Sequence, residues 1–332
     1  MSLSRSLDAA RQRLKLVTRL AETWIRRPSS PTRAVFDLTR RCNLRCAMCR
    51  TWERDSHGEL SAAQLSTVFD AMPRLCWLDL TGGEPMLRRD FPAIVDAALD
   101  RLPSLGMLHF QSNGSMPEQT LALVTAARKR RPQVELIVTV SIDGPAELHD
   151  KIRGRGGAFA RAIATTQGLQ AAANDDPGLQ VHVGTTVTAA NATAFEGVGA
   201  LLASLVPGFS AARWHWNVGQ HSEHFYGNGT TEGVQPGLPE GQLGAAIARH
   251  LRRRGLPRSM VALMESVYLV NLHAVADGHP SKIPCQALRS TVFLSPEGDV
   301  YPCHIWDRPL GNVTEQSFET IWASATVAAA RR

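Results

Sequence analysis

A regular alternation of short apolar segments with helix-like segments is the feature that most restricts how this chain can fold. Six segments have the length and apolar content of buried strands, namely 34–39, 76–81, 107–112, 136–142, 180–187 and 212–218. Helical segments with apolar residues on one face lie between them, at 61–72, 90–102, 119–130, 159–172 and 192–205. Repeated strand–helix units favour a parallel sheet with right-handed crossovers. We therefore predict an α/β fold in which the units curl into a partial (βα)6 parallel barrel.

The rest of the chain predicts further parts around this barrel. Two helical segments, 239–253 and 259–276, follow the last strand candidate and bridge to a C-terminal tail. In that tail, Pro296-Glu-Gly298-Asp is a turn sequence between two short strand candidates. The predicted division of the 332 residues is an N-terminal amphipathic helix and linker at 1–30, the barrel at 31–237, bridging helices at 238–277, and a small hairpin-plus-helix extension at 278–332.

The N-terminal segment 1–26 reads as a basic amphipathic helix. Its apolar residues recur at spacings of four and three, with arginines off that stripe. The stripe comprises Leu3, Leu7, Ala10, Leu14, Val17, Ala21 and Trp24. Such a helix either packs against its own domain, which is the commoner fate of an apolar stripe, or lies on a membrane surface. Contact of residues 1–26 with a membrane therefore stays the alternative.

Composition and charge exclude several classes of protein. No apolar run reaches the ~20 residues that span a bilayer, and the N-terminus lacks the continuous apolar stretch of a signal peptide. We therefore expect a cytoplasmic, reducing location, where cysteines are metal ligands more often than disulfides. The net charge is 36 minus 30, or +6, and the basic runs 128–131 and 252–254 end predicted helices, where cations complement the helix dipole. Since no aromatic-and-basic stripe accompanies this charge, we expect no nucleic-acid partner.

Half of the chain's 6 cysteines lie in one short run, Cys42-Asn-Leu-Arg-Cys46-Ala-Met-Cys49. A Cys-x3-Cys-x2-Cys loop can place three thiolates around one corner of an inorganic cluster, but it cannot complete a four-ligand cage. The missing ligand indicates a coordination position left open for chemistry. The alternative is a zinc knuckle whose fourth ligand lies elsewhere in the chain.

The other distinctive polar motifs also follow strand candidates. Active sites of parallel barrels collect on the loops after the strands, so these motifs are expected on the same rim as the cysteines. Thr81-Gly82-Gly83-Glu84-Pro85 follows the second strand, and its glycines can bring backbone close to a ligand beside a carboxylate. The remaining rim motifs are Gln111-Ser112-Asn113-Gly114, Ser141-Ile142-Asp143-Gly144 with His149, Asp150 and Arg153, Thr185 to Thr188 with Asn191, and Trp214, Trp216 and Asn217. Each has a structural explanation when taken singly, but their convergence favours a site.

Several other polar or reactive residues have simpler interpretations. Cys76 begins a strand candidate and is expected to be a buried apolar residue. His182 and His215 lie within strand candidates, where core histidines are expected. The Gly-, Asn- and Thr-rich segment 219–237, which contains His224 and Tyr226, is either a substrate-contacting loop or a connector to the bridging helices.

Cys42-x3-Cys46-x2-Cys49 together with Gly82-Gly83-Glu84-Pro85 resembles the radical S-adenosylmethionine (radical SAM) superfamily, over residues 34–218. The resemblance implies that the three cysteines hold three irons of a [4Fe–4S] cluster, while the fourth iron chelates the amino and carboxylate groups of SAM. It implies that Glu84 and the adjacent backbone bind the SAM amino group. The further implied contacts are Ser141 and Arg153 near the SAM carboxylate, Ser112, Asn113 and Asp143 near the ribose, and Met48 and Val187 against adenine. Met48 stands where the family often has an aromatic residue.

The chemistry that this resemblance implies is reductive. An electron from a flavodoxin- or ferredoxin-like donor enters the cluster, SAM is cleaved to methionine, and a 5′-deoxyadenosyl radical abstracts hydrogen from the substrate. The motifs identify no catalytic acid or base.

The tail carries a second, smaller cysteine pattern. Cys285 and Cys303 form the pattern Cys-x12-Gly-x4-Cys, which resembles the start of the SPASM or twitch extension of peptide-modifying radical SAM enzymes. That extension normally brings further cysteines, and none follows Cys303 in this sequence. Three explanations stay open: an auxiliary cluster with incomplete cysteine ligation, helped by His304 or by substrate; a fold retained without its cluster; or a sequence cut short of its last cysteines.

The tail makes a peptide or other natural-product intermediate the leading substrate class, to be oxidised, cross-linked or rearranged. The N-terminal helix motivates a second hypothesis, a lipid or isoprenoid substrate at a membrane surface. A non-enzymatic zinc- or iron-binding protein is the hypothesis from a different functional class.

Overall fold

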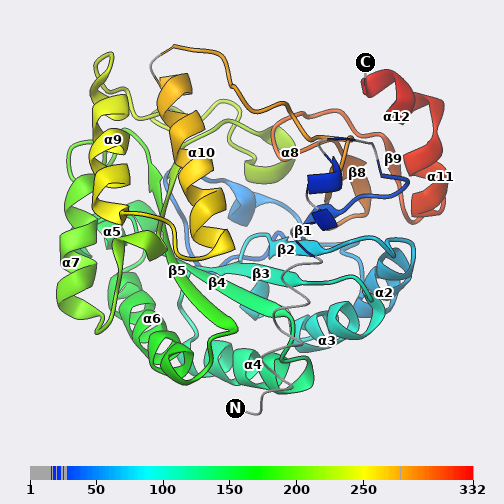
Figure 1. The fold of residues 1–332 in the computed structure, drawn as a ribbon, viewed down its shortest axis with the longest axis horizontal. Coiled ribbons are helices and arrows are strands. Elements are labelled where there is room, and N and C mark those ends of the chain that lie inside the picture. The colour runs from blue at the N-terminus through cyan, green and yellow to red at the C-terminus, as the bar shows by residue number, and fades with distance from the viewer. Residues whose placement is uncertain are drawn as a thin grey trace.

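The computed structural model describes residues 16, 18–19, 21–23, 25, 28–276 and 278–331. In this part of the chain, one 9-stranded sheet runs in the order β6-β5-β4-β3-β2-β1-β7-β8-β9. The strands β1 to β6 are parallel and curl into an open barrel with helices on its outer face (Figure 1). Strand β7 continues the sheet beyond β1 in parallel, and β8 and β9 follow antiparallel. The predicted α/β fold, a partial barrel with a hairpin-plus-helix extension, is confirmed.

Alternate side chains of each strand face two different environments. Outward-facing residues such as Phe36, Leu80 and Phe110 are buried in the main core, between the sheet and its helices. The strands are β1 Arg33–Asp37, β2 Trp77–Thr81, β3 Met107–Ser112, β4 Glu135–Ser141, β5 Leu179–Val187, β6 Trp214–Val218, β7 Thr291–Leu294, β8 Asp299–Tyr301 and β9 Gly311–Asn312.

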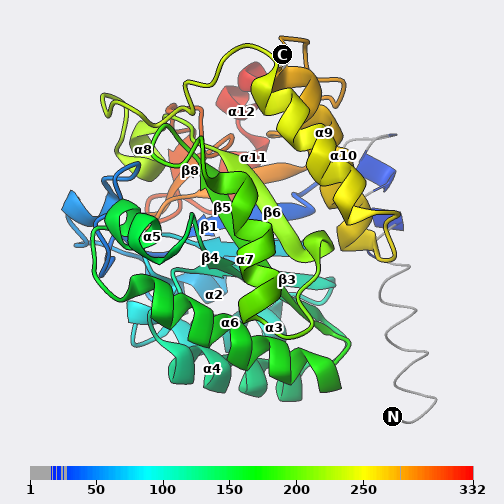
Figure 2. The same cartoon turned by 90° about the vertical axis from the view of Figure 1, so that its left-hand side faces the viewer.

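The helices begin where the sequence offers capping residues. Ser61 accepts a hydrogen bond from the Gln64 N–H and donates its own N–H to the Gln64 side chain, so a capping box starts α2 at Ala62–Asp70. Figures 1 and 2 show α2, α3, α4 and α6 along the outer face, α9 and α10 beside β5 and β6, and α11 and α12 next to the C-terminal strands. The helices are α2 Ala62–Asp70, α3 Phe91–Arg101, α4 Pro117–Arg130, α5 Ala146–Arg153, α6 Ala158–Asp175, α7 Val198–Leu205, α8 Glu223–Tyr226, α9 Gln242–Arg254, α10 Met260–Ala276, α11 Phe318–Ala323 and α12 Ala325–Ala330.

Several predicted elements begin later in the structure than the sequence indicated, and a local turn explains two of them. The helix expected from residue 192 starts only at Val198, because Asn191 folds the chain after β5 into a turn by accepting from the Thr188 N–H at 2.8 Å. The strand expected from residue 212 starts at Trp214, since Ser210 caps a short 3-10 helix at Ala211–Arg213. Two short helices, α5 and α8, were not predicted from the sequence.

A second, small apolar cluster closes the inner face of the barrel at the end where the strands begin. Leu16, Cys76, Met107 and Ile137 are buried there, with Val261 of α10 packed against them. The expectation that Cys76 is a buried apolar residue is confirmed. Most of the predicted N-terminal helix, and with it the predicted membrane contact, lies outside the described residues. Of its predicted apolar stripe, Ala21 is described and is exposed.

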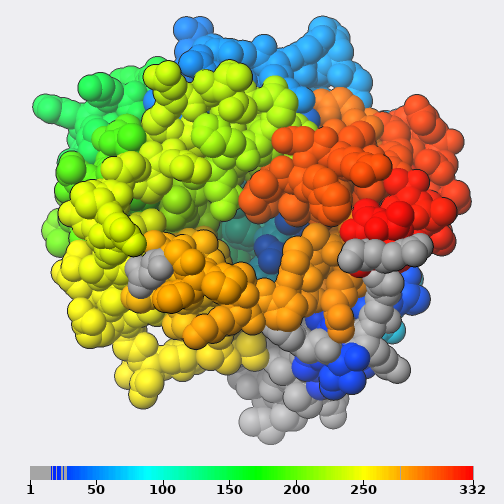
Figure 3. Space-filling view, turned by 90° about the horizontal axis from the view of Figure 1, so that it is seen from above, coloured from blue at the N-terminus to red at the C-terminus, as the bar shows by residue number. Residues whose placement is uncertain are grey.

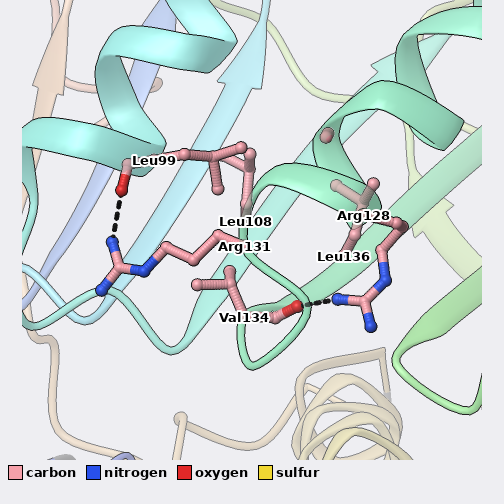
Figure 4. Close-up of a pocket in the computed structure, with 7 residues that line it drawn as sticks. Leu99, Leu108, Arg128, Arg131, Val134 and Leu136 are labelled. Atoms are coloured by element: carbon pink, nitrogen blue, oxygen red, sulfur yellow. Dashed lines mark hydrogen bonds between the residues drawn. The ribbon is translucent and has the colours of Figure 1, made fainter.

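The basic run at the end of α4 is structural. Arg131 donates to the Leu99 carbonyl at 2.6 Å and Arg128 donates to the Val134 carbonyl, on opposite sides of a small, mostly apolar pocket (Figure 4). Arg128 also forms an ion pair with Asp176 at 2.7 Å. None of the described helices has the length and apolar content needed to cross a bilayer.

Candidate functional site

The clustered cysteines Cys42, Cys46 and Cys49 lie on the loop after β1, at the edge where the parallel strands end. All three are free and partly buried. Among the described residues, no group of three His, Cys, Asp or Glu side chains converges on a site for a single metal ion. A cluster does not need that convergence, because each thiolate binds a different iron atom.

The cysteine loop is held against the end of α5 by its own backbone. The N–H groups of Arg45 and Ala47 donate to the carbonyls of Arg153 and Ile152, at 3.0 and 2.8 Å. Gly154 ends α5 in the left-handed region, with φ of 65°. A Cβ at Gly154 would lie 2.5 Å from the Arg45 carbonyl oxygen, so the close approach of helix and loop requires glycine.

Burial controls the protonation of the Cys42 and Cys46 thiols. It raises the pKa of Cys42 to about 12. Burial also raises the pKa of Cys46, against the opposing effect of the Arg153 guanidinium, whose Nη1 lies 3.7 Å from the Cys46 Sγ. Since the thiolate is the metal ligand, metal binding at this loop must release protons from these thiols.

The Gly82–Pro85 segment, which follows β2, packs directly on the cysteine loop. The Gly83 N–H donates to the Thr39 carbonyl and the Glu84 N–H donates to the Arg41 carbonyl, each at 2.7 Å. A Cβ at Gly83 would lie 2.2 Å from the Arg41 carbonyl oxygen, and Gly82 has φ of 137°. The two glycines are therefore required by the contact between the loops, and Pro85 then begins a short 3-10 helix.

Glu84 is fully buried and joins the ends of β2 and β3. Its carboxylate accepts from the Asn113 N–H at 2.7 Å, the Ser112 hydroxyl at 3.0 Å and the Met86 N–H at 3.2 Å. Burial nevertheless raises the pKa of Glu84 to about 7, against these hydrogen bonds. The Asn113 amide in turn donates to the side chain of Asn43 in the cysteine loop, at 2.8 Å. The predicted contacts of Glu84, Ser112 and Asn113 with SAM stay predictions.

Asp143 and Arg153 belong to the motif that follows the fourth predicted strand. They form a buried ion pair, with 2.7 Å between the Arg153 Nη2 and the Asp143 Oδ2. Burial opposes the charge of Arg153, but the Asp143 carboxylate and Cys46 together outweigh it and keep the pKa of Arg153 above its usual value. The Asp143 carboxylate also accepts from the Thr186 N–H at 3.0 Å. Burial and the Arg153 charge lower the pKa of His149 to about 4, so this histidine is neutral and its Nδ1 accepts from the Asp143 N–H at 3.1 Å.

The remaining predicted contacts of the site lie at different depths. Ser141 is the last residue of β4 and is partly exposed beside Gly184 of β5. Val187 ends β5 and packs in the main core. Met48 is partly exposed on the cysteine loop, and its carbonyl accepts from the Asn228 amide at 2.8 Å. The predicted contacts of Met48 and Val187 with adenine stay predictions.

The inner face of the barrel is polar and open on one side. Figure 3 shows a hollow between the α10 segment and the C-terminal extension, with the first strands at its floor. On β2, Asp79 accepts from Arg33 Nε at 2.8 Å and Trp77 Nε1 at 3.0 Å, and it lies 2.7 Å from His109 Nδ1. Burial works against the charge of Asp79, but Arg33 and His109 outweigh it and lower the pKa of Asp79 to about 2.

A second polar group forms the wall of the barrel between β6 and α10. The His215 Nδ1 lies 2.7 Å from the Glu265 carboxylate, and the Tyr268 hydroxyl donates to the Asn217 side chain at 3.1 Å. The interpretation of His215 as a core histidine is therefore wrong: its side chain is 26% exposed and paired with a carboxylate. This ion pair could not be predicted from a local sequence motif, because Glu265 belongs to a bridging helix 50 residues after His215. His182, by contrast, is buried as expected.

The C-terminal pair of cysteines flanks the β7–β8 hairpin. Cys285 is exposed before β7, and Cys303 is partly exposed after β8. His304, the suggested additional ligand, has its Nε2 3.1 Å from the Gln220 side-chain oxygen. A metal at Cys285 and Cys303 stays a prediction.

The donor set of the cysteine loop fits the group that the sequence implies. Three partly buried thiols lie on the loop, and the buried guanidinium of Arg153, at the end of α5, lies next to one of them. This arrangement suits an anionic thiolate-bound cluster and a ligand with a carboxylate. Because Gly82 and Gly83 carry no side chains, the segment after β2 presents its backbone at the edge of the sheet where the cysteine loop lies.

Comparison with known proteins agrees with this geometry. Residues 36–188 match the Radical SAM superfamily, and residues 285–332 match SPASM, an iron–sulfur cluster-binding domain. The mycofactocin maturase MftC of Mycobacterium ulcerans is 30% identical over 329 residues, which cover 93% of this chain and 79% of that relative. The AdoMet-dependent heme synthase of Oleidesulfovibrio alaskensis is 27% identical, over 86% of this chain and 73% of the relative.

Solved structures share the fold. Streptococcus suis SuiB bound to S-adenosylmethionine has a TM-score of 0.62 at 14% identity, over 92% of this chain and 68% of that chain. The anSMEcpe structure with bound AdoMet has a TM-score of 0.57 at 15% identity, over 90% of this chain and 83% of that chain. Fold and site together define a SAM-dependent iron–sulfur enzyme. More particularly, the chain belongs to the radical SAM superfamily and has a SPASM-type C-terminal region.

Proposed function

We propose that this protein is a peptide maturase, which abstracts hydrogen from a peptide and so oxidises, cross-links or rearranges it. The observation that carries the proposal is the 30% identity to MftC over 79% of that maturase, together with the SPASM match. The subtilosin biosynthesis protein AlbA of Bacillus subtilis, 25% identical over 60% of its own length, points the same way. The hollow between the α10 segment and the C-terminal extension (Figure 3) is the proposed entrance for the peptide.

In this proposal, Cys42, Cys46 and Cys49 hold the [4Fe–4S] cluster. When bound, the cluster and SAM supply the electron and the 5′-deoxyadenosyl radical. Arg153 binds the SAM carboxylate while it stays paired with Asp143. Because the Glu84 oxygens already accept three hydrogen bonds, we assign the SAM amino group chiefly to the backbone of the Gly82–Pro85 segment.

Further contacts and partners complete the proposal. The polar contacts to the ribose and carboxylate come from Ser112, Asn113, Asp143 and Ser141, and the adenine contacts from Met48 and Val187. The electron donor is a flavodoxin- or ferredoxin-like protein. The proposed location is cytoplasmic, because the chain uses its cysteines as free thiols for metal binding.

A second candidate substrate is a tetrapyrrole or similar small natural product. The named relatives of this kind are AdoMet-dependent heme synthases, one of them 27% identical over 73% of its length. The lipid hypothesis gains no support from these relatives, and the helix that motivated it lies mostly outside the described residues.

The first experiment separates the enzyme from a non-enzymatic metal protein. The purified protein is reconstituted anaerobically with iron and sulfide, reduced with dithionite, and given SAM. Release of 5′-deoxyadenosine is expected, and it should be lost in the C42A/C46A/C49A triple variant but kept in C76A, whose cysteine lies in the small buried cluster where the strands begin. A protein with a filled cluster that releases no 5′-deoxyadenosine would overturn the enzymatic function.

The second experiment identifies the substrate class. The short peptide encoded nearest to the gene is prepared with deuterium on its carbon atoms, and a deuterated tetrapyrrole carboxylate serves as the other arm. Deuterium is expected in the released 5′-deoxyadenosine from the peptide. Transfer from the tetrapyrrole, with none from the peptide, would overturn the peptide proposal. The auxiliary cluster is tested separately, by counting iron and sulfide per chain in the wild type and in the C285A/C303A variant. A lower count in the variant would support a cluster at these two cysteines.

A further inference from the structure

The short helix α8 lies between the two cysteine-bearing regions. Ser222 caps it, accepting from the Phe225 N–H at 3.2 Å. The Asn228 side chain accepts from the Ser222 N–H at 2.9 Å and donates to the Gln220 carbonyl at 3.0 Å, which closes residues 220–228 into a compact loop. Within the segment 219–237, which the sequence left open as a substrate loop or a connector, residues 220–228 therefore form a hydrogen-bonded unit.

One side of this unit holds the residues that flank Cys49. The carbonyl of Tyr226 accepts from the Arg50 N–H at 2.8 Å, and the carbonyl of Phe225 accepts from the Thr51 hydroxyl at 2.9 Å. The Asn228 amide donates to the Met48 carbonyl. The backbone before and after Cys49 is thus fixed by α8 and its C-terminal neighbour.

The other side of the unit is held by the C-terminal extension. The Asp307 carboxylate accepts from the N–H groups of Glu223 and His224, at 3.2 and 2.8 Å, and contacts the His224 Nδ1 as well. The His224 Nε2 lies 3.1 Å from the Cys303 carbonyl oxygen, and its ring stacks on Tyr301 with 4.1 Å between centroids. The His224 side chain is buried, and its ring has polar partners at both nitrogens.

His224 is one of the residues of this unit that contact both regions. Its ring is bound by Asp307 and by the Cys303 carbonyl, while its own carbonyl accepts from Arg54 Nη1 at 2.6 Å. We propose that His224, held by Asp307, is a positioning residue that transmits the placement of the C-terminal extension around Cys303 to the backbone around Cys49. A shift of the extension then changes the exposure and geometry of Cys49, and through it the cluster. This inference rests on the proposed function for its catalytic consequence, but the mechanical coupling is a property of the apoprotein.

The test measures the reactivity of individual cysteines in the metal-free protein. Native apoprotein is treated with iodoacetamide, and the alkylation rate of each cysteine is read by peptide mass spectrometry. In H224A and D307N the rate at Cys49 is expected to rise about five- to tenfold, the change that loss of one hydrogen bond brings to a local opening. H224Q, which keeps one side-chain donor, should lie between H224A and the wild type.

The matched control is D299N. Asp299 accepts from the Asn312 side chain at 2.9 Å within the extension and has no contact with α8 among those described. Its variant should alkylate Cys49 at the wild-type rate. Buried Cys76 should stay protected in every variant, which reports that the sheet is intact. If H224A does not fold, the alkylation rate of Cys49 in D307N tests the proposal instead. That variant should fold, because the Asp307 side chain is 44% exposed and asparagine has the same shape as aspartate.

Two results would overturn the proposal. One is an unchanged rate at Cys49 in the folded variants. The other is an equal rise at Cys49 and Cys76, which would indicate general destabilisation rather than positioning. In reconstituted protein, D307N should also alter the electron paramagnetic resonance spectrum of the reduced cluster, whereas D299N should not. Because alkylation uses apoprotein, failure of SAM cleavage with the expected alkylation pattern would refute the proposed function and leave the coupling intact.

Discussion

The Arg40 guanidinium donates two hydrogen bonds of 3.1 Å each, from its Nε and its Nη2, to the Glu297 carboxylate. The pair joins the start of the cysteine loop to the turn of the β7–β8 hairpin, although 257 residues separate the two in sequence. Arg40 is 1% exposed and also contacts Asp37 at 2.5 Å, so its guanidinium lies between two carboxylates. The C-terminal extension is thus fixed to the cysteine loop at this pair as well as at α8.

Removing Glu297 should weaken the whole fold, because it leaves the buried Arg40 charge with one carboxylate. We expect E297A to lose about 1–3 kcal/mol of unfolding free energy, the usual cost of leaving a buried donor without its partner. Urea denaturation followed by circular dichroism measures this change. The control is E315A, at an exposed site of the same extension, which should match the wild type. Equal midpoints for E297A and E315A would show that the pair adds no stability.

Asp37 should make stability depend on pH. Burial raises its pKa from 3.8 to about 7, against the opposing charge of Arg40. The folded state therefore holds a proton that the unfolded chain releases, and the unfolding free energy from this group falls as pH rises from about 4 to about 7. Below the lower value both states are protonated, and the contribution is complete.

The D37N variant, which cannot release that proton, isolates the effect. Its urea midpoint should fall less than that of the wild type between pH 4 and pH 7, while other groups act equally in both proteins. The control is D70N, at an exposed residue of α2, whose pH profile should follow the wild type. Parallel profiles for D37N and the wild type would contradict the prediction.

The strand–helix alternation and the rim motifs were readable from the sequence because they depend on local patterns. Periodicity located the six barrel strands β1 to β6, and the rule that strand ends share one edge brought Asp143 and Arg153 together with the cysteines. Parallel pairing of β7 with β1 was not predicted, since it joins segments at opposite ends of the chain.

Pairs across long sequence distances account for the functional residues that were missed. Two such pairs are Arg40 with Glu297 and His215 with Glu265. Each pair joins residues from unrelated motifs, so the spacing of residues in the sequence does not predict the contact. The helix α8 was missed because its residues 223–226 are too few to show a period. The burial of Val187 in the main core was not predicted either, because the face of the sheet that a residue of β5 occupies depends on the strand's register.

Arg153 should be needed in its full guanidinium form. Its two terminal nitrogens reach Asp143 and Cys46 at once, at 2.7 and 3.7 Å, which a lysine ammonium cannot reproduce. We expect R153K to keep its iron but release 5′-deoxyadenosine about tenfold more slowly, a loss of about 1.4 kcal/mol of transition-state stabilisation. R153M, which leaves Asp143 buried without its partner, should lose about 3–5 kcal/mol of unfolding free energy.

The measurement for R153K is the rate of 5′-deoxyadenosine release per cluster, with iron counted in each sample. R252K, at an exposed residue of α9, is the control and should keep the wild-type rate. If R153K releases 5′-deoxyadenosine at the wild-type rate with equal iron content, the Arg153 guanidinium does not act on SAM.

Gly83 should tolerate no side chain, because its Cβ would lie 2.2 Å from the Arg41 carbonyl oxygen and 2.7 Å from the Arg41 carbonyl carbon. Those atoms are backbone of the cysteine loop, so the two loops must separate and the hydrogen bonds at Thr39 and Arg41 must break. We expect G83A to lose about 1–3 kcal/mol of unfolding free energy, as overpacked cores do, and to retain less iron after reconstitution. The matched variant is G168A, in the middle of α6, where a Cβ meets no atom within 4 Å. It should gain up to about 1 kcal/mol, because alanine favours the helix over glycine. Iron retention by G83A equal to that of G168A would mean that the contact between the two loops does not hold the cysteines in place.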